Sequence, residues 1–178
     1  MSVLLQISQL GHPVLRQKAK DVEDVKNPGL QQLIDDMIAT CKDANGFGIA
    51  APQVYQPLRL FIIASKPSSR YPNAPEMEPT AIINPTIIST STKKEEGWEG
   101  CLSIPGIRGL VPRHKYITVS FTDRNGERQK RTYRDFVARV LQHEFDHING
   151  IVFLDRTKPT DLATEKEYLK IIQGIGRK

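Results

Sequence analysis

The sequence predicts an α+β fold in which antiparallel strands pack around a central helix, with further helices near the N-terminal and C-terminal ends. Apolar residues recur at helical spacing over 27–43 and 134–149, but they alternate with polar residues over 115–123, as in a half-buried strand. Antiparallel strands flanked by helices are typical of α+β proteins. The 178 residues contain no internal repeat and no linker-like stretch, so we expect a single domain over 1–178.

The first predicted helix covers residues 27–43. Its apolar side chains share one helical face: Leu30, Leu33, Ile34, Met37, Ile38 and Cys41. A cysteine on such a face is most often a small buried side chain. We therefore interpret Cys41 as structural.

The following segments predict strands and a loop. Residues 58–64 (LRLFIIA) are rich in β-branched and aromatic side chains, which predicts a buried strand. Proline and serine are frequent in residues 66–79, which predicts a surface loop. Residues 81–84 and 86–89 predict two short strands, interrupted by Pro85.

A β-hairpin is predicted next. Residues 115–123 form its first strand, and residues 126–133 (GERQKRTY) return as the partner strand. The turn between them is Asp123-Arg124-Asn125-Gly126, because Asn-Gly tolerates positive φ at both central positions.

Residues 134–149 predict the second helix. Its apolar side consists of Phe136, Val137, Val140, Leu141 and Ile148. Residues 151–154 (IVFL) predict one more strand. Thr160 or Asp161 can cap a last helix that runs to about residue 173.

Charge and composition narrow the class of function. A formal net charge of +5 favours polyanionic neighbours, but lysine and arginine are scattered apart from 124–134 and 166–178. We therefore do not expect nucleic-acid binding to be the main function. No stretch approaches the ~20 apolar residues of a membrane span, and the start of the chain lacks the basic region of a secretory signal. A soluble monomer is expected, in a bacterial-type cytoplasm or in an organelle after removal of a transit peptide.

The strongest functional signal is the run His143-Glu144-Phe145-Asp146-His147 in the second predicted helix. Side chains four positions apart share a helical face, so the imidazoles of His143 and His147 can reach one metal ion, with Glu144 nearby. The alternative is a coincidental polar helix face. Because the chain has only four histidines, we favour the metal site.

A catalytic metal normally has three protein ligands and one open position. The metzincin pattern is ruled out because Phe153 stands where its third histidine would be. Cys101 is the better candidate, since a thiolate is a strong soft ligand and the glycine and proline around it predict a tight loop. Two alternatives stay open: a thermolysin-like site with Glu165 or Glu167 as the third ligand, and a purely structural metal in a binding module.

The segment GFGIAA at residues 46–51 also fits the loose G-x-G-x-x-A pattern of dinucleotide-binding proteins. Its context opposes that reading. A helix rather than a strand precedes it, Pro52 obstructs a following helix, and no acidic residue lies near 66–70. We therefore do not expect a dinucleotide cofactor.

Three motifs in order along the chain resemble those of the peptide deformylase family. They are GFGIAAPQV, EGCLS, and HEFDH preceded by Gln142. The resemblance spans roughly residues 5–157 and implies a peptide deformylase-like catalytic domain. Two departures, Ile49 where leucine is frequent and Tyr55 where glycine is frequent, put only the outer shape of the glycine-rich loop in doubt.

The resemblance implies a reaction and a cofactor. It implies hydrolysis of the N-formyl group from the N-terminal formyl-methionine of nascent polypeptides, which releases formate. Carried over to this sequence, it makes Cys101, His143 and His147 the metal ligands and Glu144 the general base and acid. The ligands suit several divalent ions, while the resemblance implies Fe²⁺ in cells, with Zn²⁺, Ni²⁺ or Co²⁺ in preparations.

The resemblance also implies substrate contacts. Gln53 and the backbone amide of Leu102 would stabilise the oxyanion. The backbone at Gly46 and Gly48 would pair with substrate, and Arg108 matches a position near the entrance of the cleft.

A pocket for the methionine side chain needs apolar walls. We assign Phe47, Phe136 and Val140 to them as a hypothesis, with Gly100 on the same substrate-binding surface. The basic C-terminal stretch 166–178 is a candidate contact with the ribosome, and a solvated helix face is its alternative.

Overall fold

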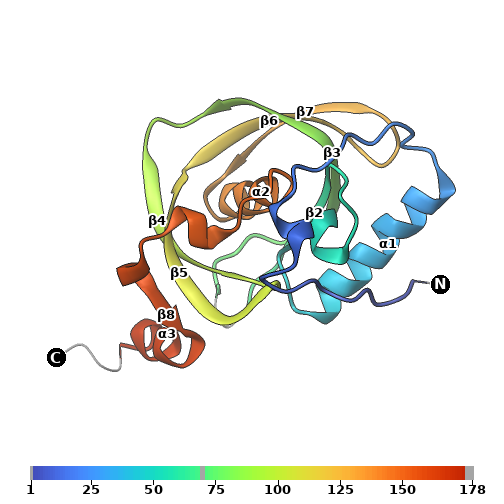
Figure 1. Cartoon of the computed structure of the whole chain (residues 1–178). Helices are drawn as coiled ribbons and strands as arrows, with labels where there is room; N and C mark the ends of the chain where they lie inside the picture. The colour runs from blue at the N-terminus through green and yellow to red at the C-terminus, as the bar shows by residue number, and fades with distance from the viewer. Residues whose placement is uncertain (1, 69–70, 175–178) are drawn as a thin grey trace.

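The computed structural model describes residues 2–68 and 71–174, which form a mixed arrangement of helices and antiparallel sheets. One sheet has five strands in the order β1-β2-β3-β6-β7, and the other has three in the order β4-β5-β8 (Figure 1). The strands are β1 Gly48–Ala50, β2 Leu60–Ser65, β3 Met77–Thr90, β4 Lys94–Cys101, β5 Ile104–His114, β6 Tyr116–Thr122, β7 Arg128–Arg134 and β8 Leu162–Thr164. The α-helices are α1 Pro28–Asp43, α2 Asp135–His147 and α3 Glu165–Ile172, and the 3-10 helices are η1 Pro13–Arg16, η2 Ala51–Val54, η3 Phe153–Arg156 and η4 Pro159–Asp161.

The five-stranded sheet is covered by α1 on one face and by α2 on the other. Along β2, Phe61 and Ile63 belong to the apolar cluster around α2, whereas Leu60 and Ile62 belong to the cluster around α1. Successive strand residues point to opposite faces, so a strand buried on both faces needs an uninterrupted apolar run. This explains why residues 58–64 read as a buried strand.

Helix α1 confirms the prediction for residues 27–43. The Asn27 side chain accepts hydrogen bonds from the backbone N–H groups of Gly29 and Leu30, and Pro28 occupies the first turn, where its missing N–H is harmless. Most of the expected apolar face is buried, with Leu33 and Ile38 partly exposed, and Cys41 is only 2% exposed. Cys41 therefore packs as a small hydrophobic side chain.

The buried position of Cys41 leads to a testable prediction. Burial is the largest cause that raises the pKa of its thiol, to about 12, so almost no reactive thiolate forms at pH 8. We expect iodoacetamide to leave Cys41 unlabelled in the folded protein and to label it after unfolding in guanidinium. Peptide mass spectrometry measures this, and equal labelling in both states would contradict the prediction.

Helix α2 contacts β1 and β2 of one sheet and β5 of the other, and Figure 1 shows it enclosed between them. It confirms the helix predicted over 134–149, with ends one or two residues inside those limits. After it the chain turns at Gly150, which has φ +73°. A Cβ atom there would lie 2.7 Å from the carbonyl oxygen of Arg16. Glycine is therefore required both for the left-handed φ and for the lack of space.

The predicted interruption at Pro85 is wrong, because β3 continues through it. The strand register against β6 shifts between Ile83 and Thr86, where Asn84 adopts a left-handed φ of 48°. Proline is tolerated at such an irregularity because no ladder hydrogen bond is required of it there. The predicted loop over 66–79 correspondingly ends where β3 begins, at Met77.

The β6–β7 hairpin is confirmed, but its turn differs from the expected form. Gly126 has φ +82°, whereas Asn125 is not in the left-handed region. The Gly126 N–H donates to the Asp123 carbonyl, and the Asp123 N–H donates to the Glu127 carbonyl. These bonds define a three-residue loop with one left-handed glycine, rather than a two-residue Asn-Gly turn.

Two predictions in the C-terminal part of the chain are wrong. Residues 151–154 do not form a strand, because Phe153 begins the 3-10 helix η3. The last helix begins at Glu165 and is capped by Thr164, since the residues expected to start it pair as β8 with β5. Of the basic stretch 166–178, residues 175–178 lie outside the described residues. Within the described part of the chain, no helix is long and apolar enough to cross a membrane.

Candidate metal centre and active site

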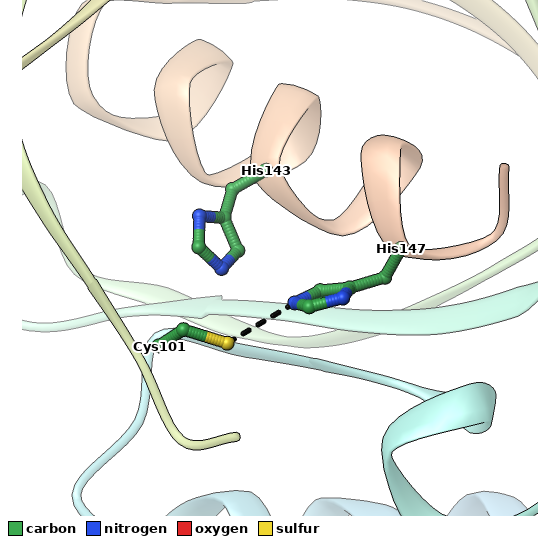
Figure 2. A group of neighbouring side chains, drawn as sticks. All are labelled: Cys101, His143 and His147. Atoms are coloured by element: carbon green, nitrogen blue, oxygen red, sulfur yellow. Dashed lines mark hydrogen bonds between the residues drawn. The ribbon is translucent and has the colours of Figure 1, made fainter. Parts of the chain in front are cut away.

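Cys101, His143 and His147 converge in the structure (Figure 2). Cys101 is the last residue of β4, and the two histidines lie one turn apart on α2. One ligand atom from each lies within 4.8 Å of the others, and Cys101 Sγ is 3.2 Å from His147 Nε2. Among the described residues, these three make up the group of acidic, cysteine and histidine side chains that could hold a metal ion.

The glutamates of the thermolysin-like alternative do not converge with the two histidines. Glu165 forms an ion pair with Arg108, and Glu167 is exposed and pairs with Lys170. Neither belongs to the group with the two histidines.

The β4–β5 ladder is irregular beside Cys101. Glu99 pairs with Gly109, but Cys101 pairs with Ile104, so the register shifts between the two pairs. The extra residues of this irregularity belong to β5, so Glu99 and Cys101 keep the two-residue spacing of a strand, and both contact histidines of α2. Leu102 and Ser103 after the cysteine turn the chain tightly into β5, in keeping with the loop expected there.

Glu99 holds the ring of His143 in place. Its Oε2 atom lies 2.9 Å from His143 Nδ1, and its carboxylate also accepts two hydrogen bonds of 3.0 Å from the Arg113 guanidinium. Burial alone would raise the pKa of Glu99, but the bond to His143 and the charge of Arg113 outweigh it and hold this pKa well below its ordinary value. An ionised carboxylate can only accept, so Nδ1 of His143 donates to it, and Nε2 is the nitrogen that could bind a metal. Burial opposes the charged ring, but the contacts with Cys101 and Glu99 outweigh it and hold the pKa of His143 well above its ordinary value, so metal binding there would release a proton.

A second carboxylate extends this buried network. Arg113 Nη1 donates to Asp146 Oδ2 at 2.6 Å, and Arg156 Nη2 donates to Asp146 Oδ1 at 2.7 Å. Arg139 Nη1 adds a bond of 2.9 Å to Glu99. These pairs tie β4, β5 and η3 to the helix that carries both histidines.

This network was not predicted from the sequence. One signal was present: Glu99 stands two residues before Cys101, and residues two apart in a strand point to the same side. Nothing local indicates Arg113, which is fourteen residues away and reaches Glu99 only because β4 and β5 pair.

Gln53 is oriented by three contacts. It lies in η2 and is 1% exposed. Its Oε1 atom accepts from the Ala50 N–H at 2.8 Å, which fixes which end of the amide is the donor. Its Nε2 atom then donates to Ser103 Oγ at 3.2 Å and points at Cys101 Sγ, 3.4 Å away.

Glu144 lies against the glycine-rich segment. A Cβ atom at position 48 would lie 2.5 Å from Glu144 Oε1, so only glycine lets the backbone of β1 approach this carboxylate. Glu144 is 4% exposed, and burial is the largest cause that raises its pKa, to about 7. Its Oε2 atom is buried without a hydrogen-bond partner among the described residues. A buried acceptor without a partner is rare in proteins, and it indicates that Glu144 Oε2 accepts a hydrogen bond from a water or a ligand.

The donor set also fits a metal ion. Burial is the main cause that lowers the pKa of His147 well below its ordinary value, so its ring is neutral, as a metal ligand must be. A thiol sulfur and two imidazole nitrogens within 4.8 Å of one another match the ligands of a divalent transition metal.

Gln53, Glu99, Cys101, His143 and Glu144 border a cavity of about 330 Å³. The positions expected to bind substrate all line it: Gly46, Phe47, Gly48, Gly100, Leu102, Arg108, Phe136 and Val140. Phe47 and Phe136 meet edge to face with centroids 5.0 Å apart, and Tyr71 packs 4.8 Å from Phe136. Tyr71, Trp98 and Glu165 also line the cavity and were not expected there. Tyr71 comes from the segment predicted as a surface loop, and Glu165 comes from the C-terminal helix α3.

Comparison with known proteins agrees with this arrangement. The family model for polypeptide deformylase matches residues 4–163. The chain is 61% identical over 170 residues to peptide deformylase 2 of a Nostoc species, covering 95% of each chain, and 46% identical over 154 residues to peptide deformylase 2 of Shewanella oneidensis, covering 86% and 84%.

Solved structures show the same likeness. The Met-Ala-Ser-bound crystal structure of the class I type b peptide deformylase from Acinetobacter baumannii aligns with a TM-score of 0.85 at 43% identity, covering 88% of this chain and 99% of that one. The peptide deformylase from Synechococcus elongatus in complex with actinonin aligns at 0.78 and 35%, covering 97% and 87%. By its sequence, its fold and the matched motifs, this chain belongs to the peptide deformylase family of hydrolases.

Proposed function

We propose that Cys101, His143 and His147 hold one divalent metal ion, and that the chain uses this site to remove the formyl group from N-formylmethionyl peptides. The observation that carries the proposal is the convergence of one sulfur and two imidazoles beside a cavity that also contains Glu144 and Gln53. On this view α2 is the central element of the fold, because it supplies two ligands and the acid–base group together.

The bound ion would supply Lewis acidity, which polarises a carbonyl oxygen and acidifies water. The ligand set does not choose among transition metals, so the family resemblance is the reason to expect Fe²⁺ in cells and Zn²⁺, Ni²⁺ or Co²⁺ in preparations.

Glu144 is proposed to move the proton. A carboxylate whose pKa lies near 7 can both accept and return a proton at neutral pH, which general acid–base catalysis requires. It takes a proton from the water that attacks the formyl carbon. When the C–N bond breaks, it delivers that proton to the leaving amine, and the products are formate and a peptide with a free N-terminus.

Gln53 and the backbone amide of Leu102 are proposed to stabilise the oxyanion. The Gln53 amide is already held with its N–H₂ group toward Cys101, so little reorganisation is needed when negative charge develops on the formyl oxygen. The Leu102 N–H is the next backbone donor after the ligand Cys101 and lines the same cavity.

Replacing Gln53 by alanine is therefore expected to lower kcat by about 10²–10³-fold, the usual loss for one oxyanion donor. The metal ligands are unchanged, so metal content should stay the same. Steady-state deformylation kinetics, with metal analysis of the same sample, measure both. A loss below tenfold in a folded, metal-replete variant would contradict this role.

The substrate would lie along the glycine-rich segment, with its methionine side chain in the aromatic pocket. The backbone at Gly46 and Gly48 borders the cavity, and Phe47, Phe136 and Val140 supply apolar surface. The relative from A. baumannii was solved with Met-Ala-Ser bound, which supports a peptide with N-terminal methionine as the occupant. Gly100 and Arg108 border the part of the cavity next to Cys101.

The experiment that tests this function compares two peptides. We expect release of formate from formyl-Met-Ala-Ser, and far slower release of acetate from acetyl-Met-Ala-Ser, because a formyl-specific enzyme needs a site too short for larger acyl groups. Metal content is measured on the same preparation. A metal-replete enzyme that leaves the formyl peptide intact would overturn the proposal.

A second experiment separates the rival metal sites. Cys101→Ser is expected to lose metal and activity, whereas Glu167→Gln, at an exposed position, should retain both. The reverse pattern would favour the thermolysin-like site.

Nascent formylated chains are the proposed partners, and we propose a monomer that acts in a bacterial-type cytoplasm. The basic stretch 166–178 is a candidate ribosome contact through its lysine and arginine side chains. Cosedimentation with ribosomes, with and without residues 175–178, tests this contact.

A further inference from the structure

Glu165 brings a negative charge from the C-terminal helix to the substrate cavity. Strand β8 pairs with β5, with Ala163 opposite Arg108, so α3 begins two residues after that pair. The first residue of α3 is Glu165, and it lines the same cavity as Arg108 and Glu144. The Glu165 side chain is 34% exposed, whereas Glu144 is 4% exposed. Glu165 is therefore on the solvent side of the cavity, where the peptide beyond the formyl-methionine must pass.

Glu165 and Arg108 form a two-pronged ion pair. Arg108 Nη2 donates to Glu165 Oε1 at 3.1 Å, and Arg108 Nε contacts Glu165 Oε2. Two parallel bonds between guanidinium and carboxylate fix both groups more firmly than a single contact. The side chain of Arg108 is 13% exposed, so the pair is partly screened from solvent.

Two further contacts hold the arginine at the cavity wall. Its guanidinium lies 5.4 Å from the ring centroid of Tyr168, which is itself 2% exposed and packs against Trp98. A Cβ atom at Gly100 would collide with the same guanidinium. Arg108 thus rests on the backbone directly before the ligand Cys101, and it cannot swing away without losing Glu165 and Tyr168.

This pairing changes the charge that a substrate meets. Arg108 alone would present a fixed cation and would favour peptides with acidic side chains after the methionine. With Glu165 bound to it, the two charges of this pair offset each other. A neutral pair discriminates less between acidic and basic peptides than Arg108 alone would, since electrostatic selectivity requires a net local field.

We propose that Glu165 is a specificity-determining residue, which neutralises Arg108 so that the cavity accepts formyl-methionyl peptides with either acidic or basic side chains downstream. This inference rests on the proposed function and deepens it. Its substrates are formylated peptides that differ in charge at the third and fourth positions.

The test uses formyl-Met-Ala-Glu-Glu amide and formyl-Met-Ala-Lys-Lys amide. The measured quantity is the ratio of kcat/KM for the acidic peptide to that for the basic one. We expect Glu165→Gln to raise this ratio by about three- to tenfold. Without Glu165, the charge of Arg108 attracts the acidic peptide and repels the basic one, and both of these partly exposed interactions shift the ratio in the same direction. Arg108→Gln should lower the ratio, and 0.5 M NaCl should shrink both shifts.

Glu167→Gln is the matched control, since it removes one negative charge from the same helix at a side chain that is 56% exposed and pairs with Lys170. An equal ratio in Glu165→Gln and Glu167→Gln would overturn the inference. A uniform fall in kcat/KM for both peptides would also overturn it, because that result means that Glu165 only anchors α3. If the unaltered enzyme deformylates neither these peptides nor formyl-Met-Ala-Ser, the proposed function itself fails, and this inference with it.

Discussion

Replacing Glu144 by glutamine is expected to lower kcat by about 10²–10⁴-fold, the range over which a positioned acid–base group contributes. Glutamine has nearly the same shape, so the packing against Gly48 should persist. It cannot accept a proton, however, and the attacking water then loses its base and the leaving amine its acid. The variant should bind metal as well as the parent does, because Glu144 is not among the three converging ligands.

Deformylation of formyl-Met-Ala-Ser, with metal analysis of each sample, measures this effect. Glu167→Gln makes the same change of charge at an exposed site and should leave kcat within about twofold, as is usual for surface substitutions. Full activity of a metal-replete Glu144→Gln variant would mean that the metal is purely structural, and it would revive the binding-module alternative.

The two helices that matter most could be predicted because their signals are local. The apolar period of α2 and the spacing of His143 and His147 depend only on which residues share a helical face. Asn27 followed by Pro28 marks the start of α1 in the same way. Cys101 was predicted from chemistry, since two imidazoles need a third ligand, a thiolate is a strong soft one, and the glycine and proline around it predict a tight loop.

The missed features depend on which distant segments pair. Residues 151–154 have the composition of a strand, but Val152 and Phe153 bury their side chains from a 3-10 turn without a partner strand. Residues 162–164 read as the start of a helix, yet they add to the edge of β5 because that edge is available. The strand or helix propensity of a short segment does not tell whether a distant strand has an unpaired edge that the segment can join. For the same reason Glu165 was weighed only as a metal ligand or a surface residue, not as the partner of Arg108.

Replacing Glu99 by glutamine should be the most destabilising change outside the proposed metal ligands. Glu99 is 5% exposed and accepts from His143, Arg113 and Arg139 at once. Removing one member of a buried ion network leaves charge uncompensated, which typically costs about 3–5 kcal/mol of the free energy of unfolding. Loss of the partner that orients a ligand histidine typically weakens metal binding by about 10–100-fold. Both effects should appear together, in denaturant unfolding of the metal-free protein and in metal titration.

The exposed neighbour Glu96 on the same strand provides the matched control, and Glu96→Gln should change neither quantity appreciably.

The pH dependence of stability provides an independent check. The pKa of Glu99 is lower in the folded protein than the ordinary value near ~4.3 expected in the unfolded chain, so its contribution to stability is complete above that value and is lost as pH falls below it. Glu99→Gln lacks this contribution at every pH, and the stability difference between parent and variant should narrow below about pH 4. A difference that stays constant from pH 7 to pH 3 would mean that the carboxylate charge is not what stabilises the network, and that Glu99 acts there only through its shape.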